Sequence, residues 1–167
     1  MALPNEVFQI LAMLAATYPR FNLTKETSLV YSQMLRDIPA DMLKAAALQC
    51  ARTRDFFPSV NELLQAVYDL NSKIQGIPSP AEAWKEVALA KSDYRDWSHP
   101  LVKKVAYDLG WNNYLFPTDN ISTDRAHFFK AYDRAIQDYF SDSYALPEIR
   151  DFIESSKQLY EQLPAGE

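Results

Sequence analysis

The strongest helix-start signal in the first half of the chain is the stretch Phe-Phe-Pro-Ser-Val-Asn-Glu-Leu at residues 56–63. Ser59 and Glu62 have the spacing of a capping box, in which each side chain bonds a backbone N–H that the first helical turn leaves free. The apolar residues that follow repeat with the period of a helix. The stretch therefore predicts a helix of about fifteen residues that begins near Val60, and the aromatic pair Phe56 and Phe57 marks the end of the helix before it.

Three apolar stripes lie upstream of this stretch. Their residues recur at the i, i+3, i+4 spacing of one helix face, which predicts helices over 4–17, over 25–37 and up to about Arg54. Pro19 disfavours helical geometry at Tyr18 and so ends the first of them. We expect the second helix to carry its apolar stripe on Val30, Tyr31, Met34, Leu35 and Ile38.

Residues 76–80 are the strongest candidate for a domain boundary. Within Ile-Gln-Gly-Ile-Pro-Ser-Pro, residues 74–80, one glycine and two prolines follow the end of the predicted helix. Ser79 and Glu82 then repeat the capping box and open a helix that carries Trp84. Further stripes predict helices that begin near Pro100 and that run over about 123–140 and 147–163.

The pattern predicts an all-α protein of about eight helices. No segment alternates apolar and polar residues over the length of a strand, and no Asn-Gly or Asp-Gly hairpin signal occurs. A compact N-terminal four-helix domain is followed by a second small helical unit. The expected divisions are an N-terminal domain at 1–75, a linker or hinge at 76–80, the second unit at 81–142 and a C-terminal helix or tail at 143–167.

Composition argues against most enzyme classes. The chain has 167 residues, of which 48% are hydrophobic and 23% charged, as in a globular protein. Three glycines offer little from which to build a phosphate-binding loop, and the motif GxxxxGK[ST] is missing. Cys50 is the single cysteine, and two separated histidines do not make an ordinary zinc site. We therefore expect no enzyme activity, no cofactor and no metal.

The sequence also predicts where the protein works. No apolar run approaches the ~18 residues of a membrane span, and the acidic N-terminal segment does not resemble a signal peptide. We therefore expect a cytoplasmic protein that does not enter a membrane.

Charge favours a protein partner over DNA. Residues 1–75 hold seven basic and seven acidic side chains, whereas residues 76–167 hold ten basic and fifteen acidic, which gives the net charge of -5. Strong nucleic-acid binding depends on clustered Lys and Arg. The one local argument for DNA is Arg52 and Arg54 beside Phe56, at the end of the third predicted helix.

The order and spacing of these segments resemble the phage replicative-helicase loader/inhibitor proteins. An opening helix leads to Tyr18-Pro19-Arg20-Phe21, and Phe57-Pro58-Ser59-Val60 is similar to the family's Phe-Pro-Pro-Ser-(Ile or Val) signature, with one proline in place of two. Longer prophage relatives resemble the segments around Trp84 and onward to Tyr132. The resemblance covers about residues 15–140.

The resemblance implies a non-enzymatic adaptor of phage or prophage DNA replication. Such a protein binds the hexameric replicative DNA helicase of the bacterial host, inhibits it, and assists its loading together with an origin-binding phage protein. Two alternatives stay open on the residues alone. One is a DNA-binding replication or regulatory protein that uses the N-terminal helices, and the other is a structural phage protein.

The tail is the expected partner surface. Tyr144, Phe152 and Tyr160 lie where the demand for core residues is weakest, and exposed aromatic anchors ringed by charge are typical of protein contacts. The alternative is that the tail closes the second helical bundle.

The missing phosphate loop generates the first testable prediction. Purified protein should turn over no ATP, with or without DNA, because the chain has no motif to bind the phosphates. The measurement is phosphate release across the fractions of the final purification column. ATP turnover that follows the protein peak would contradict the adaptor interpretation.

Overall fold

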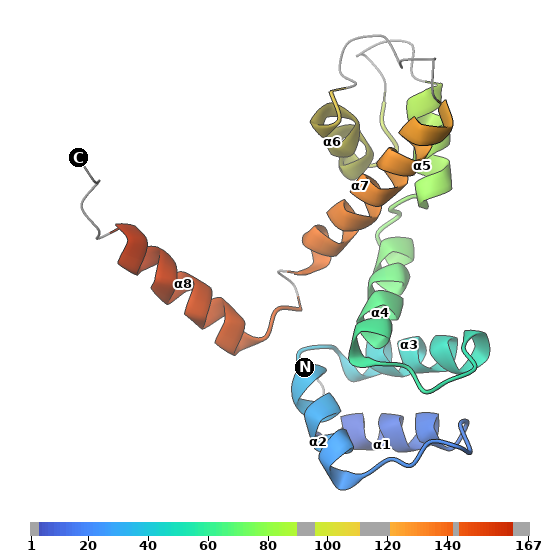
Figure 1. Ribbon diagram of the computed structural model, residues 1–167, viewed down its shortest axis with the longest axis vertical. Coiled ribbons are helices and arrows are strands. Elements are labelled where there is room, and N and C mark those ends of the chain that lie inside the picture. The colour runs from blue at the N-terminus through green and yellow to red at the C-terminus, as the bar shows by residue number, and fades with distance from the viewer. Residues whose placement is uncertain (1–3, 90–95, 111–120, 142–143, 162–167) are drawn as a thin grey trace. The chain divides into compact units, whose positions relative to one another are not determined.

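The computed structural model describes residues 4–89, 96–110, 121–141 and 144–161, with the side chains of 158–161 excepted. These residues form helices and no strand, which confirms the predicted all-α class (Figure 1). The helices are α1 Pro4–Ala15, α2 Lys25–Met34, α3 Ala40–Thr53, α4 Val60–Ile74, α5 Pro80–Ala88, α6 Pro100–Asp108, α7 Ile121–Ser141 and α8 Pro147–Glu161.

The helices belong to two compact units. Unit 1 comprises Met1–Leu64 together with Ser141–Glu167, and unit 2 comprises Gln65–Phe140. The division therefore falls inside α4 and not at residues 76–80, and the tail is grouped with unit 1. That 76–80 acts as a hinge stays a prediction.

Residues 76–80 are held within unit 2, which explains why the division does not fall there. Gly76 ends α4 with a φ of 69°, a left-handed conformation that suits glycine at a helix end. Ile77 is buried, and the carbonyl oxygen of Pro78 accepts a hydrogen bond of 3.1 Å from the hydroxyl of Tyr132. Glycine and proline thus terminate α4 and lead into α5.

Unit 1 is built on α1, which packs against α2 and α3. The buried residues of α1 are spaced as one helix face, and α3 buries the stripe that its sequence predicts, including Cys50. Alanines in α3 allow the α1 and α3 backbones to approach closely. The buried side chains of the two helices are Val7, Ile10, Leu11, Leu14, Leu43, Ala46, Ala47 and Cys50.

The predicted stripe of α2 is wrong for two of its residues. Val30 and Met34 are 49% and 47% exposed, and the helix buries Ser28 and Ser32 in their place. Residues 28, 32 and 35 follow one another at i, i+4 and i+7, so the face that carries the serines leads directly to buried Leu35. The hydroxyl of Ser28 donates to the carbonyl oxygen of Thr24 at 2.9 Å, which satisfies that buried polar group. Periodicity identified the helix but assigned its buried face incorrectly.

An aromatic core holds unit 2 together. Trp84 of α5 contacts Phe128 of α7 with ring centroids 5.7 Å apart, and Phe128 stacks on Tyr132 at 5.4 Å. Tyr68 of α4 stacks on Phe140 at 5.7 Å. The long α7 therefore contacts both α4 and α5.

Side-chain caps begin two helices of unit 2. Ser79 and Glu82 form the complete capping box that their spacing predicts, with Pro80 in the first helical turn. His99 caps α6, because its Nδ1 accepts a hydrogen bond of 3.1 Å from the backbone N–H of Leu101. These caps place α5 and α6 at defined points along the chain.

The buried hydroxyl of Tyr132 generates the second prediction. Tyr132→Phe should lower the free energy of unfolding by about 1 kcal/mol, because it removes the hydrogen bond to Pro78 and keeps the ring. The measurement is urea unfolding followed by circular dichroism. Tyr139→Phe is the matched control, since the Tyr139 hydroxyl bonds Gln75 on the surface, and its effect should stay within about 0.5 kcal/mol. Equal effects of the two changes would contradict the role given to Tyr132.

Candidate functional site

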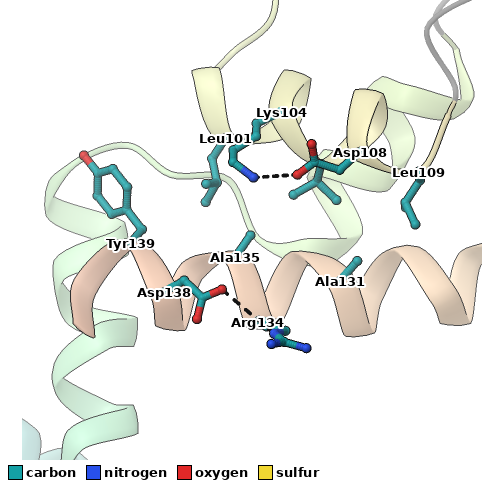
Figure 2. A pocket seen from close by; sticks show the side chains of 10 residues that line it. Leu101, Lys104, Asp108, Leu109, Ala131, Arg134, Ala135, Asp138 and Tyr139 are labelled. Atoms are coloured by element: carbon teal, nitrogen blue, oxygen red, sulfur yellow. Dashed lines mark hydrogen bonds and ion pairs between the residues drawn. The ribbon is translucent and has the colours of Figure 1, made fainter. Parts of the chain in front are cut away.

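Unit 2 carries an open groove between α6 and α7. Its volume is about 580 Å³, and both walls contribute apolar side chains, with Ala131 and Ala135 on the α7 side. Figure 2 shows an ion pair along each helix, Lys104 with Asp108 and Arg134 with Asp138. The sequence analysis did not identify this groove, although two alanines four residues apart on an otherwise bulky helix are a signal for it.

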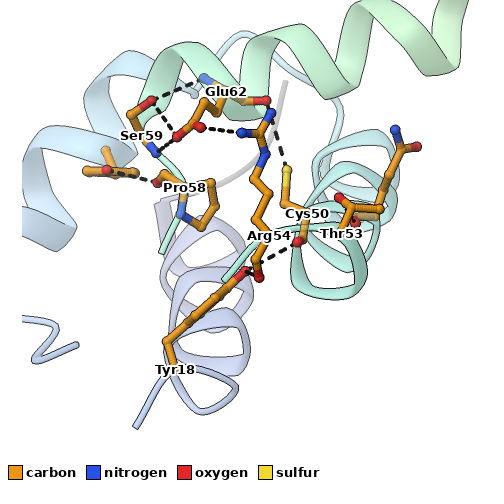
Figure 3. A network of polar contacts seen from close by, with 9 residues as sticks. Tyr18, Cys50, Thr53, Arg54, Pro58, Ser59 and Glu62 are labelled. Carbon is orange, nitrogen blue, oxygen red and sulfur yellow. Dashed lines mark hydrogen bonds and ion pairs between the residues drawn. The ribbon is translucent and has the colours of Figure 1, made fainter. Parts of the chain in front are cut away.

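The turn between α3 and α4 contains the capping box predicted from the sequence. The backbone N–H of Ser59 donates to Oε2 of Glu62 at 2.8 Å, and the N–H of Glu62 donates to Oγ of Ser59 at 3.3 Å. The second carboxylate oxygen of Glu62 pairs with Arg54 at the end of α3 (Figure 3). These bonds and the arginine hold the pKa of Glu62 below its usual value. One carboxylate thus joins the end of α3 to the start of α4.

Tyr18 also holds the turn between α3 and α4 in place. Its ring is buried, and its hydroxyl lies 3.2 Å from the carbonyl oxygen of Cys50, in the last turn of α3, and 3.4 Å from that of Arg54, the residue after α3 (Figure 3). Burial raises the pKa of Tyr18, so the hydroxyl stays protonated and donates. The tyrosine that the family motif singles out therefore has a structural role: it joins the segment after α1 to the end of α3.

The remaining motif residues surround Phe57. Phe21 stacks on Phe57 with ring centroids 3.8 Å apart, and Tyr31 meets Phe57 edge to face at 5.8 Å. The Tyr31 hydroxyl donates to the carbonyl oxygen of buried Pro58 at 3.1 Å. Pro19 is exposed. The structure thus brings the predicted motif residues of unit 1 together, but as supports of the loops and not as a reactive site.

A cavity of about 540 Å³ opens beside this aromatic cluster. It is lined by residues 17–21 and by the segment that follows α3, with Phe56 among the lining residues. Phe56 is 80% exposed, unlike its neighbour Phe57. An apolar cavity beside an exposed aromatic side chain is suited to binding a side chain or a flat ring.

The predicted partner residues differ in their surroundings. Phe152 of α8 is 71% exposed, as a partner anchor requires. Tyr144 is half-buried and already has an interaction within the structure. Tyr160 belongs to α8, but its side chain lies outside the described residues. Trp84, a predicted motif residue, is buried against Phe128 and serves the core of unit 2. The tail as a partner surface stays a prediction.

Unit 1 carries two exposed apolar faces, and the sequence analysis expected exposure only for the one that includes Phe152. We define the α2 apolar face as Val30 and Met34, and the α8 apolar face as Ile149, Phe152 and Ile153; each of these side chains is 46% exposed or more. Arg36, two residues after α2, forms an ion pair with Glu148 in the first turn of α8.

No three His, Cys, Asp or Glu residues of the described part lie together as a set that could hold a metal ion. Cys50 is buried in the core of unit 1. Over the same residues, none of the helices combines the length and the apolar character that crossing a membrane requires.

A comparison with protein families finds a match in the N-terminal part of unit 1. The model of the G39P N-terminal domain matches residues 4–64, from the start of α1 to the first turns of α4. This is the domain of a phage gene 39 protein, from a family of helicase loaders and inhibitors. The resemblance predicted from the sequence is thus confirmed over these residues. No curated protein and no solved structure matches the chain.

The lowered pKa of Glu62 generates the third prediction. A carboxyl group whose pKa is lowered by folding stabilises the fold at pH values above its ordinary pKa of 4.5. It loses that contribution as the pH falls through the pKa of the folded state. Glu62→Gln should therefore lower stability at about pH 7 and flatten its decline toward about pH 3. Urea midpoints across this range provide the measurement.

The control for this prediction is Glu154→Gln. Glu154 is exposed on α8 and has no hydrogen bond or ion pair within the described part of the chain. Its replacement should leave the pH dependence of the urea midpoint unchanged. The role given to Glu62 fails if the urea midpoints of both variants depend on pH in the same way as those of the wild type.

Proposed function

We propose that the protein is a non-enzymatic adaptor that binds a replicative hexameric DNA helicase, inhibits it and assists its loading in phage or prophage DNA replication. The match of residues 4–64 to the G39P N-terminal domain carries this proposal, because that family is associated with helicase inhibition and loading. The adaptor works in the cytoplasm of the bacterial host. An origin-binding phage protein is its second partner.

The surface of unit 1 supports a protein partner. Large apolar side chains on α2 and α8 are exposed, and an interface between proteins is the usual place where such side chains become buried. Neither face contains a charged cluster of the kind that follows a phosphate backbone. The energy of loading then comes from binding and from the helicase's own nucleotide cycle.

The alternative function, DNA binding by the N-terminal helices, is favoured by one observation. Phe56 is 80% exposed beside a cavity, and Arg52 near it is exposed as well. An aromatic side chain next to a cation can stack on a base of single-stranded DNA. Against this, Arg54 is paired with Glu62, and Asp55 lies between Arg54 and Phe56 in the chain.

The fourth prediction separates these two functions. The intact chain should bind the purified replicative helicase of its host and slow the unwinding of a forked DNA substrate. Fluorescence anisotropy with labelled helicase measures the binding, and a parallel titration with labelled duplex and single-stranded DNA measures the alternative. Salt-sensitive DNA binding without helicase binding would contradict the adaptor proposal.

Phe152→Ala tests whether the tail takes part. Because Phe152 is exposed, its loss should weaken helicase binding while the melting temperature stays at the wild-type value. Phe56→Ala is the matched control, because it removes another exposed phenylalanine. Its affinity for the helicase should equal that of the wild type. Unchanged helicase affinity of Phe152→Ala would remove this residue from the contact.

A further inference from the structure

Unit 2 contains another cavity, which is lined by α4, by α7 and by the segment that leads from α4 into α5. Its volume is about 330 Å³. All of its lining residues lie beyond Leu64, where the match to the G39P N-terminal domain ends. The cavity therefore belongs to a part of the chain that the family match does not cover. Its polar lining residues on the helices are Gln65, Asp69, Ser72 and Lys73 of α4, Glu82 of α5 and Asp133 of α7.

Hydrogen bonds within unit 2 hold the walls of this cavity together. Gln65, Asp69 and Ser72 are at positions i, i+4 and i+7, so they lie on one face of α4. Oε1 of Gln65 accepts a hydrogen bond of 3.2 Å from Nε2 of Gln137 on α7. The segment 77–80 is fixed to α7 by the bond from the Tyr132 hydroxyl to Pro78. The cavity is thus formed before any ligand arrives.

The charge on the cavity wall is unbalanced. The carboxylates of Asp69 and Asp133 lie on different helices, and neither forms a hydrogen bond or an ion pair within the described part of the chain. With Glu82 and Lys73, the wall carries three acidic residues and one basic residue. Burial and the nearby charge of Asp69 raise the pKa of Asp133, so the ionised form of Asp133 is disfavoured. A cation between the two carboxylates would stabilise both.

Ser72 lines the same cavity and has an unused hydroxyl. The residue is 9% exposed, and its Oγ has no hydrogen-bond partner in the described part of the chain. A buried hydroxyl without a partner is unfavourable and uncommon in folded proteins. An N–H donor that enters the cavity would provide the missing bond. The cavity thus offers two carboxylates and one hydroxyl to a cationic donor.

We propose that this acidic cavity binds the side chain of an arginine that a protein partner supplies. The inference goes beyond the proposed function, because it gives unit 2 a binding site of its own. A guanidinium group has five N–H donors in a planar fork, so it can bond acceptors on several sides at once. A metal ion fits less well, because no three His, Cys, Asp or Glu residues among the described ones are grouped to hold it.

The apolar part of the cavity suits the stem of the same side chain. Ile77 and Ile136 are buried, and both line the cavity. Arginine packs its methylene groups along an apolar surface while its charged end reaches polar acceptors. Asp69 and Asp133 are exposed, so the cavity opens at the surface, where a side chain of another protein can enter. The acidic excess of residues 76–167 favours a basic partner in the same way.

An NMR titration of the isotope-labelled full chain with N-acetyl-L-arginine amide tests the cavity. The backbone amide signals of Ser72, Ile77 and Asp133 should shift and saturate, with a Kd on the order of 1 mM for so small a ligand. N-acetyl-L-citrulline amide has nearly the same shape without the charge, and it should cause no saturable shift. N-acetyl-L-lysine amide should bind several-fold more weakly, because its ammonium group lacks the planar fork.

The decisive variant is Asp69→Asn with Asp133→Asn. Loss of both charges should weaken arginine binding by about tenfold or more. The melting temperature should not fall, because the change removes two like charges that lie near each other. Asp151→Asn is the matched control, since it removes an exposed carboxylate of α8, outside unit 2. Its affinity for the arginine amide should equal that of the wild type.

Ser72→Ala separates a contact with the ligand from a role in the fold. Because the Ser72 hydroxyl has no partner within the described part of the chain, its loss should not lower the melting temperature. Arginine binding should weaken several-fold, because one acceptor is gone. A lower melting temperature with unchanged affinity would show that the hydroxyl serves the fold, which would overturn its place in the site.

The other outcomes also decide the proposal. Equal shifts with the citrulline amide, shifts that do not saturate, or unchanged affinity of the Asp69 and Asp133 double variant would each overturn the site. Lysine amide that binds as tightly as arginine amide would overturn the preference for a guanidinium group. Arginine binding without helicase binding would contradict the proposed function and leave this site standing, whereas the reverse result would remove only the site.

Discussion

The Glu62 carboxylate is the interaction on which unit 1 depends most. With one oxygen it closes the capping box on Ser59, and with the other it pairs with Arg54, whose backbone carbonyl lies against the Tyr18 hydroxyl. The Glu62 side chain therefore joins the end of α3 to the first turn of α4, and the Tyr18 hydroxyl adds the segment after α1 through the backbone of Arg54. α4 begins at this turn, with its residues up to Leu64 in unit 1 and the rest in unit 2.

Local rules predicted those parts of the fold that depend on neighbouring residues. The capping boxes at Ser59 and Ser79 formed as expected, because each needs only residues three positions apart. The buried face of α2 was assigned wrongly, because Val30 and Ser32 lie on nearly opposite sides of the helix and the side that carries the serines is the buried one. Apolar periodicity cannot reveal a buried stripe that consists of serines.

Long-range contacts explain the other differences between sequence and structure. Glycine and prolines at 76–80 suggest a boundary, yet the bond from Tyr132 to Pro78 spans 54 residues and holds this segment within unit 2. The same limit applies to the contact between the end of α2 and the start of α8. Phe152 could be proposed from sequence as an exposed aromatic residue, whereas the pairing of Arg36 with Glu148, 112 residues apart, has no local signal.

The burial of Trp84 against Phe128 has a consequence for spectroscopy. The three tryptophans of the chain, at positions 84, 97 and 111, all belong to the sequence range of unit 2, whereas unit 1 contains tyrosine and phenylalanine as its aromatic residues. Tryptophan emission thus follows the environment of one unit, and far-ultraviolet dichroism follows the helices of both. The chain therefore carries its own reporter of whether the two units lose their structure in one step or in two.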